Sequence, residues 1–304
     1  MLCAVSVDLD EIHHYHAIHG LPPPTGRGAT AVYDVALDRL EALARAHHLP
    51  LTLFAVGADL GQEKNAARLR ALSARGHEIA NHSLDHLYDL VRCPPAELRR
   101  QVRESSDLLE AAIGQRPLGF RAPGYAVSDD LFRILREEGF RYDSSVFPCP
   151  AYYLGKAAVL GAMRLGGRRS GTVLDSPAML RAPTRPYRVG EPYWVKGSGI
   201  LELPIQVTRR ARLPYIGTAL VLGGPRGVRW LTRDVIGERF VNLELHAMDV
   251  LDAGDGLDAL VRHQLDVRVP VDRKLEALSV AFEALRRADY GFVRLGEAAE
   301  RVAV

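Results

Sequence analysis

Short apolar runs alternate with amphipathic helical patterns along this chain, and this alternation limits the folds that it can adopt. The apolar runs that we predict as strands lie at 2–8, 51–57, 77–82, 117–123, 140–147, 200–207, 240–246 and 292–295. The predicted helices cover 32–48, 64–76, 94–114, 128–139 and 272–289. Repeated β–α units predict a parallel sheet with helices outside it, either a barrel or a doubly wound sheet.

The sequence lacks the motifs of several common α/β folds. No GxGxxG follows the first predicted strand, so a dinucleotide-binding fold has no support. A P-loop and a GxSxG motif are also absent from the sequence. A barrel places its chemistry at the carboxyl ends of its strands, so functional side chains are expected there.

Composition narrows the class of protein further. The 304 residues are 47% apolar and 25% charged, as in ordinary soluble proteins. A net charge of +2 argues against nucleic acid as a partner. Cys3, Cys93 and Cys149 fit neither a disulfide framework nor a CxxC metal clip. We expect a reducing, cytoplasmic location, because no signal-peptide pattern precedes LCAVSVD and no apolar run is long enough to span a membrane.

Acidic and histidine side chains follow two of the predicted strands. Asp8 and Asp10 end the first strand, and alternation points them to the same side. Two adjacent carboxylates repel unless a cation or a proton intervenes, although a solvated turn with a helix cap is the simpler alternative. His82 and His86 follow the third strand as H-x3-H, and on a helical turn they would share one face. Two imidazoles and one carboxylate are typical of a hydrolytic metal centre.

Two further polar residues end later strands. Arg121 ends the fourth predicted strand, before a Pro-Gly turn whose backbone N–H groups can face a pocket. It is either part of such a pocket or a surface arginine before a loop. His246 ends the apolar run at 240–246 and is either a satisfied core histidine or an active-site acid.

The order of these motifs resembles the polysaccharide deacetylase (NodB-homology) superfamily, the fold of carbohydrate esterase family 4. The segments that carry the resemblance are VSVDLDE, GHEIANHSLDH, GFRAPGYAVSDDLFRILREEGFRYDSSVFP, LELPI and LELHAMD. The resemblance is close over about 2–147 and looser over 196–304. It implies a distorted (β/α)7 barrel, formed by one domain over residues 1–304, and one divalent metal ion. Zinc is the first candidate for that ion, and Co, Ni, Mn and Fe are the others.

The resemblance also implies roles for individual residues. Asp10, His82 and His86 would be the metal ligands. Asp8 would be the general base, and Arg121 would pair with Asp8 and keep it ionised.

The same resemblance makes His246 the general acid and assigns oxyanion binding to a backbone N–H near Gly124 or Tyr125. The implied reaction removes an N-acyl group, in the first instance acetyl, from an amino sugar or glycoconjugate. A metal-activated water attacks the amide, with an Asp base and a His acid. The alternatives are a deformylase, an allantoinase-like C–N hydrolase, and an inactive barrel that binds a glycan or lipid.

Three departures from the family pattern bear on the substrate. The first motif is D-L-D instead of adjacent D-D, which looks like the branch that holds allantoinase-like deacetylases and lipid-linked formamido-arabinose deformylases. The turn reads Pro-Gly-Tyr where chitin and peptidoglycan enzymes often have Pro-Tyr-Gly. The D-x-x-D-W motif that tunes the catalytic histidine in that group is absent from the sequence.

Three segments are not explained by the predicted metal centre. The first, EIHHYHAIHG at 11–20, includes His13 and His14, which either line the pocket, bind a second metal, or lie in a loop that is merely rich in histidine. The second, the irregular stretch at 148–199, is rich in tyrosines that either stack on a sugar or fix the loop. The third, the apolar segment at 213–224, either packs in the interior or contacts a membrane surface, as a lipid-linked substrate would require.

Overall fold

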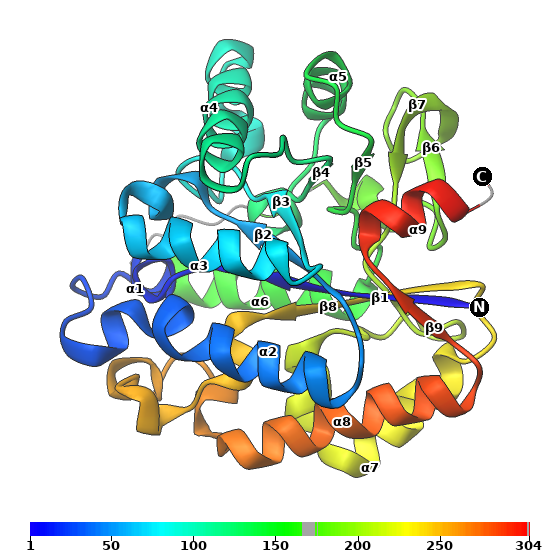
Figure 1. The fold of residues 1–304 in the computed structure, drawn as a ribbon. Coiled ribbons are helices and arrows are strands. Elements are labelled where there is room, and N and C mark those ends of the chain that lie inside the picture. The colour runs from blue at the N-terminus through cyan, green and yellow to red at the C-terminus, as the bar shows by residue number, and fades with distance from the viewer. Residues whose placement is uncertain (166–173, 175, 303) are drawn as a thin grey trace.

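A curled, largely parallel sheet forms the centre of the protein in a computed structural model that describes residues 1–165, 174, 176–302 and 304 (Figure 1). The strands are β1 (Leu2–Asp8), β2 (Leu51–Ala55), β3 (Glu78–Asn81), β4 (Gly119–Phe120), β5 (Tyr142–Asp143), β6 (Tyr187–Val189), β7 (Lys196–Glu202), β8 (Phe240–His246) and β9 (Gly291–Val293). Their order is β6-β7-β5-β4-β3-β2-β1-β8, and only β6 and β7 pair antiparallel among the described strands. The curled sheet is consistent with the predicted distorted barrel.

The first strand has partners along both of its edges. β8 pairs with β1 over its whole length, from Leu2 to Asp8. The opposite edge is shared, because β9 pairs with Leu2–Ala4 and β2 with Val5–Asp8. Six of the seven β1 residues are buried, which explains why its sequence is apolar without alternation.

One side chain of β8 connects the two ends of the curled sheet. The Asn242 Nδ2 donates to the Leu203 carbonyl at 2.9 Å and to the Ser144 Oγ at 2.8 Å. The Gln206 N–H donates to the Asn242 carbonyl at 3.0 Å. The chain that follows β7 therefore lies against β8, and the barrel is closed there without a regular strand ladder.

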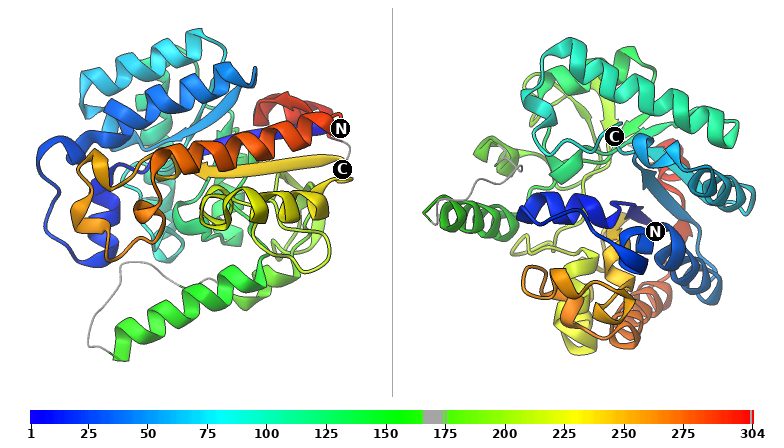
Figure 2. Two further views of the ribbon diagram at one scale, coloured as in Figure 1. Left: turned by 90° about the horizontal axis from the view of Figure 1, so that it is seen from below. Right: turned by 90° about the vertical axis from the view of Figure 1, so that its left-hand side faces the viewer.

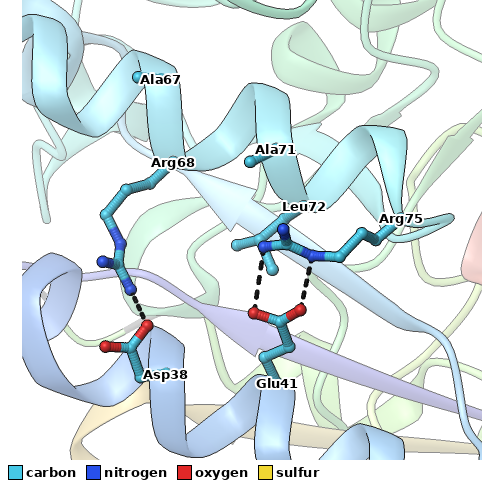
Figure 3. Close-up of a pocket in the computed structure, with 7 residues that line it drawn as sticks. All are labelled: Asp38, Glu41, Ala67, Arg68, Ala71, Leu72 and Arg75. Carbon is cyan, nitrogen blue, oxygen red and sulfur yellow. Dashed lines mark hydrogen bonds and ion pairs between the residues drawn. The ribbon is translucent and has the colours of Figure 1, made fainter.

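Helices surround the sheet (Figures 1 and 2). They are α1 (Ile12–His19), α2 (Leu37–Ala46), α3 (Glu63–Ala74), α4 (Pro95–Ile113), α5 (Asp129–Glu137), α6 (Pro150–Leu165), α7 (Gly217–Val235), α8 (Val271–Arg287) and α9 (Leu295–Arg301). α7 and α8 pack side by side. Ion pairs of Asp38 with Arg68 and of Glu41 with Arg75 connect α2 to α3 across a surface depression that contains none of the predicted site residues (Figure 3).

The structure revises the prediction of an irregular stretch at 148–199. This range contains α6, β6 and most of β7, while 166–173 and 175 lie outside the described residues. The buried Tyr187 hydroxyl donates to the Tyr193 carbonyl at 2.8 Å, so this tyrosine fixes the chain instead of facing a sugar.

The apolar segment at 213–224 packs mostly in the interior. Tyr215, Ile216, Leu220 and Val221 are buried, and α7 begins within this segment. α7 is kinked at Gly224, whose φ of 58° lies in the left-handed region, and Pro225 follows. Among the described helices, none has the length and apolar character needed to cross a membrane.

Candidate active site

The carboxyl ends of β1, β3, β4 and β8 bring the predicted site residues together. Asp8 is the last residue of β1, and Asp10 follows two residues later. His82 follows β3, Arg121 follows β4, and His246 is the last residue of β8. Asp8, Asp10, His82 and Arg121 are all at most 3% exposed.

Three side-chain atoms form a tight triangle at the predicted metal centre. The Asp10 Oδ1 lies 3.2 Å from the His82 Nε2 and 3.1 Å from the His86 Nε2. The two imidazole nitrogens are 3.2 Å apart. Ligands about 2.0–2.2 Å from a tetrahedral ion lie about 3.3–3.6 Å from one another, so these atoms are close to the spacing of a metal-ligand set.

The loop after β3 positions the two histidines without the helical turn that H-x3-H predicts. Ser83 and His86 have φ values of 66° and 52°, in the left-handed region that non-glycine residues rarely adopt. The His82 N–H donates to the Ala55 carbonyl, which fixes the loop to the end of β2. The prediction that the two imidazoles converge holds, but the irregular backbone, and not helical periodicity, achieves it.

The hydrogen bonds around the triangle indicate which of its atoms are available as metal ligands. The His82 Nδ1 lies 2.7 Å from the Arg121 carbonyl, so it carries the proton and leaves Nε2 as an electron-pair donor. The Asp10 Oδ1 is buried without a hydrogen-bond partner. Burial opposes the charge on Asp10, but His86 and His82 outweigh it and hold the pKa of this carboxyl well below its usual range. An anionic oxygen beside two imidazoles, which bind metals in their neutral form, is a suitable set of ligands for a divalent cation.

Arg121 is buried beside Asp8, as the resemblance implies. Its Nη1 donates to the Asp8 Oδ1 at 2.7 Å, and its Nη2 donates to the hydroxyls of Ser6 and Ser144 at 2.9 and 2.8 Å. Burial disfavours the guanidinium charge, yet Asp8 and Glu244 raise the pKa of Arg121 above its usual value. Sequence patterns gave no indication of the two serines, because isolated hydroxyl groups carry no periodic signal.

His246 has an acidic partner that the sequence analysis missed. The Glu244 Oε1 lies 2.9 Å from the His246 Nδ1, and the other ring nitrogen lies 3.9 Å from the Asp10 Oδ2. Burial favours the neutral ring, but Glu244 outweighs it and raises the pKa of His246 well above its usual value. Glu244 and His246 are two residues apart in one strand, so alternation was the signal that could have found this acid.

The Pro-Gly-Tyr turn lies beside His246. The Tyr125 N–H donates to the Ala122 carbonyl at 3.0 Å, whereas the Tyr125 hydroxyl lies 3.5 Å from the His246 Nε2. The Tyr152 ring of α6 packs edge-on against the Tyr125 ring, with centroids 5.6 Å apart. Because the Tyr125 N–H already donates to a carbonyl, the Gly124 N–H is the remaining candidate of the two predicted oxyanion donors.

The histidine-rich segment forms α1, and its histidines face different surroundings. The His14 ring packs against the His86 ring, with centroids 4.5 Å apart. His13 and His14 both face Asp59, a residue that the sequence analysis did not single out. The His16 Nδ1 lies 2.5 Å from the Pro22 carbonyl, and His19 stacks on His263, so these two lie outside the site.

Comparison with known proteins gives partial sequence matches. Residues 28–142 match the family described as Polysaccharide deacetylase. A chitooligosaccharide deacetylase from Bradyrhizobium sp. (strain ANU 289) is 37% identical over 87 residues, which cover 28% of this chain and 38% of the relative. Another, from Sinorhizobium fredii (strain NBRC 101917 / NGR234), is 34% identical over 128 residues, which cover 38% of this chain and 57% of the relative. The matched part therefore spans less than two thirds of either relative.

Solved structures extend the likeness to the whole chain at the level of the fold. A putative polysaccharide deacetylase from Mycobacterium smegmatis has a TM-score of 0.59 and 18% identity, over 99% of this chain and 90% of that chain. A CE4 family pseudoenzyme from Bacillus anthracis has a TM-score of 0.52 and 12% identity, over 100% of this chain and 66% of that chain. Residues 28–142 therefore resemble the family described as Polysaccharide deacetylase in sequence, and the chain as a whole shares its fold with the Mycobacterium smegmatis structure.

Proposed function

We propose that this protein is a metal-dependent hydrolase that removes an N-acyl group, acetyl in the first instance, from an amino sugar or glycoconjugate. The observation that carries the proposal is the triangle of Asp10, His82 and His86 with a buried carboxylate, Asp8, on one side and His246 on another. The names of the matched relatives, chitooligosaccharide deacetylases, support the substrate class.

The residues of the triangle would hold one divalent ion, with zinc as the first candidate. When bound, such an ion supplies Lewis acidity for an amide carbonyl and lowers the pKa of water towards about 7. The imidazole and carboxylate donors also accept Co, Ni, Mn or Fe.

Asp8 is suited to accept a proton from the attacking water. Arg121 engages its Oδ1, so the orientation of the carboxylate is fixed. Its Oδ2 lies 3.8 Å from the His82 Nε2, which places the basic oxygen beside the metal-ligand triangle. A general base in this position typically contributes about 10²–10⁴-fold to the rate.

His246 is suited to protonate the leaving amine. Its Nδ1 faces Glu244, so the imidazolium form is stabilised and Nε2 is directed to the site. The Gly124 N–H would stabilise the oxyanion, and the Lys156 Nζ, which donates to the Gly124 carbonyl at 3.1 Å, connects this turn to α6.

Two other functions compete with deacetylation of a sugar. The D-x-D spacing of Asp8 and Asp10 favours a deformylase or an allantoinase-like hydrolase, and a lipid-linked substrate belongs to the same proposal. An inactive barrel that binds a glycan or lipid is the third candidate. The acid, base and metal-ligand set argue against it, because a binding function does not require all of them.

The test begins with metal content, measured by mass spectrometry on the native protein and on His82→Ala and Asp10→Ala. We expect the triangle of Asp10, His82 and His86 to hold one ion in the native protein and none in either variant. His48→Ala, at an exposed histidine outside the site, is the matched control. Amine release is then measured on N-acetyl, N-formyl and cyclic ureide substrates. A native protein that binds no Zn, Co or Mn overturns the proposal, and glycan binding that Asp8→Asn leaves unchanged, without amine release, favours the inactive barrel.

A further inference from the structure

A second cluster of metal-ligating side chains lies beside the first and shares no residue with it. It consists of His13 and His14, at the start of α1, and Asp59, in the 3-10 turn Gly57–Gly61 after β2. The His13 Nε2 lies 3.9 Å from the Asp59 Oδ1, and the His14 Nε2 lies 4.0 Å from the Asp59 Oδ2. Two elements that are separated in the sequence therefore place three potential donor atoms within 4.8 Å of one another.

Two of these donor atoms are buried and have no partner. The His14 Nε2 and the Asp59 Oδ2 make no hydrogen bond, although their residues are only 7% and 8% exposed. Leaving a buried polar atom unpaired costs about 1–3 kcal/mol, so two such atoms facing each other indicate a missing ligand. Their separation is too wide for a direct hydrogen bond. A tetrahedral ion with bonds of about 2.0–2.2 Å to both atoms would bridge them after the side chains approach each other by about half an ångström.

The charges around the cluster favour a cation. Burial, together with the carboxylates of Glu11 and Asp10, raises the pKa of Asp59 to about 8. Glu11 accepts the N–H groups of Ile12 and Val32, which fix the position of its carboxyl group, while burial raises the pKa of this carboxyl above its usual value. A cation at Asp59 would relieve the repulsion between these carboxylates.

The two clusters are in direct contact through one histidine ring of each. The His14 ring lies against the His86 ring of the first site, and the His13 and His14 rings are 3.9 Å apart. The His13 side chain is 48% exposed, so the second cluster opens to solvent while its other two ligands are buried. An ion can therefore reach it without passing through the first site.

We propose that His13, His14 and Asp59 form a second divalent-cation site, which fills independently of Asp10, His82 and His86. Two imidazoles and one carboxylate suit zinc and related transition ions such as cobalt. An ion there would tie α1 to the end of β2 and place positive charge on the wall of the first site. The proposal does not depend on which reaction the first site performs.

The experiment measures how many ions the whole chain binds, in protein that carries no histidine tag. Chelator-treated protein is titrated with Co(II) or Zn(II) alone, and the bound metal is counted by mass spectrometry together with the visible spectrum of Co(II). We expect two ions per chain in the native protein, one in Asp59→Asn, one in His82→Ala and none in the double variant. Asp38→Asn, which alters an exposed ion pair with Arg68, is the matched control and is expected to bind two.

The outcomes separate the two sites. One ion in the native protein, retained by Asp59→Asn and lost in His82→Ala, overturns the second site and leaves the first intact. Because Asp59→Asn preserves shape, it is expected to fold, and His14→Gln provides a second variant with the same expected loss of one ion. In His82→Ala, added Zn(II) should still raise the melting temperature. In the double variant that also carries Asp59→Asn, added Zn(II) should no longer raise it. An unchanged melting temperature in His82→Ala counts against the proposal.

Discussion

Arg121 and Asp8 form a fully buried ion pair, with 2.7 Å between Nη1 and Oδ1, although 113 residues separate them in the sequence. The same guanidinium also bonds Ser6 of β1 and Ser144 after β5, and it lies over the Phe54 ring of β2 at 4.1 Å. The orientation of the proposed base and the packing of the barrel interior therefore depend on one side chain.

Replacing Arg121 by methionine is expected to destabilise the fold by about 3–5 kcal/mol, because Asp8 is left as an uncompensated buried charge. Urea unfolding measures this loss. Asp8→Asn in the same background should recover part of it, since the unpaired charge is then gone. Arg133→Met, which breaks an exposed pair with Asp130, should cost at most about 1 kcal/mol. Equal losses for Arg121→Met and Arg133→Met would contradict a buried, structurally important pair.

Asp8→Asn is expected to separate catalysis from metal binding. The asparagine can still accept a hydrogen bond from Arg121, but it cannot take a proton from water. We expect turnover on an N-acetylated oligosaccharide to fall about 10²–10⁴-fold while the first site retains its metal. Amine release and metal content are measured on the same sample. Loss of the metal in Asp8→Asn would show instead that this carboxylate is a ligand.

Glu244→Gln is expected to shift the pH dependence of the reaction. Glu244 raises the pKa of His246, so its removal lowers that pKa. An acid must be protonated to donate, and the basic limb of kcat/KM against pH should therefore move to lower pH in the variant. The KM for substrate is expected to change little. A basic limb at the same pH in both proteins would show that His246 is not the acid that this limb reports.

Asp249→Asn is expected to weaken the pH dependence of stability. Burial raises the pKa of Asp249 to about 7 from an ordinary value of 3.8, so the folded protein holds a proton that the unfolded chain releases. The protonated carboxyl therefore supports folding below about pH 4, and this support is lost as the pH rises towards about 7.

The amide cannot ionise, so the variant should lose less stability than the native protein over this range. The difference should be on the order of a few kcal/mol, since one pKa unit corresponds to about 1.4 kcal/mol. Unfolding by urea at several pH values measures it, with the exposed Asp258→Asn as control. Identical pH slopes for the native protein and Asp249→Asn would contradict a protonated Asp249.

Sequence patterns predicted the elements whose signal is local. The strand at 2–8 is a buried apolar run. The helix predicted at 94–114 from its first proline and last glycine is α4, which Gly114 caps at its C-terminus. The histidine-rich α1 escaped prediction because its histidines do not repeat along one face. α7 escaped because Gly224 and Pro225 interrupt its sequence pattern, while its packing against α8 and β8 depends on the folded chain.

The part of the candidate site that lies at the carboxyl ends of the strands was predictable from the sequence. Asp8, Asp10, His82, Arg121 and His246 converge because the carboxyl ends of parallel strands meet at one edge. Asp59 could not be found in this way, because it lies in a turn and its proximity to α1 depends on the folded structure. The loop at His86 was predicted as helical because spacing alone does not reveal left-handed backbone.

The pairing of β1 with β8 and β9 also sets the order in which the protein can be assembled during synthesis. Among the described strands, β1 is synthesised first, whereas two of its three partners, β8 and β9, are synthesised last. A partly synthesised chain has His82 and His86 on a growing sheet while the strand before Asp10 still lacks these partners. The three proposed metal ligands are therefore synthesised before β8 and β9, and the strand that precedes Asp10 gains these two partners only after those strands are made.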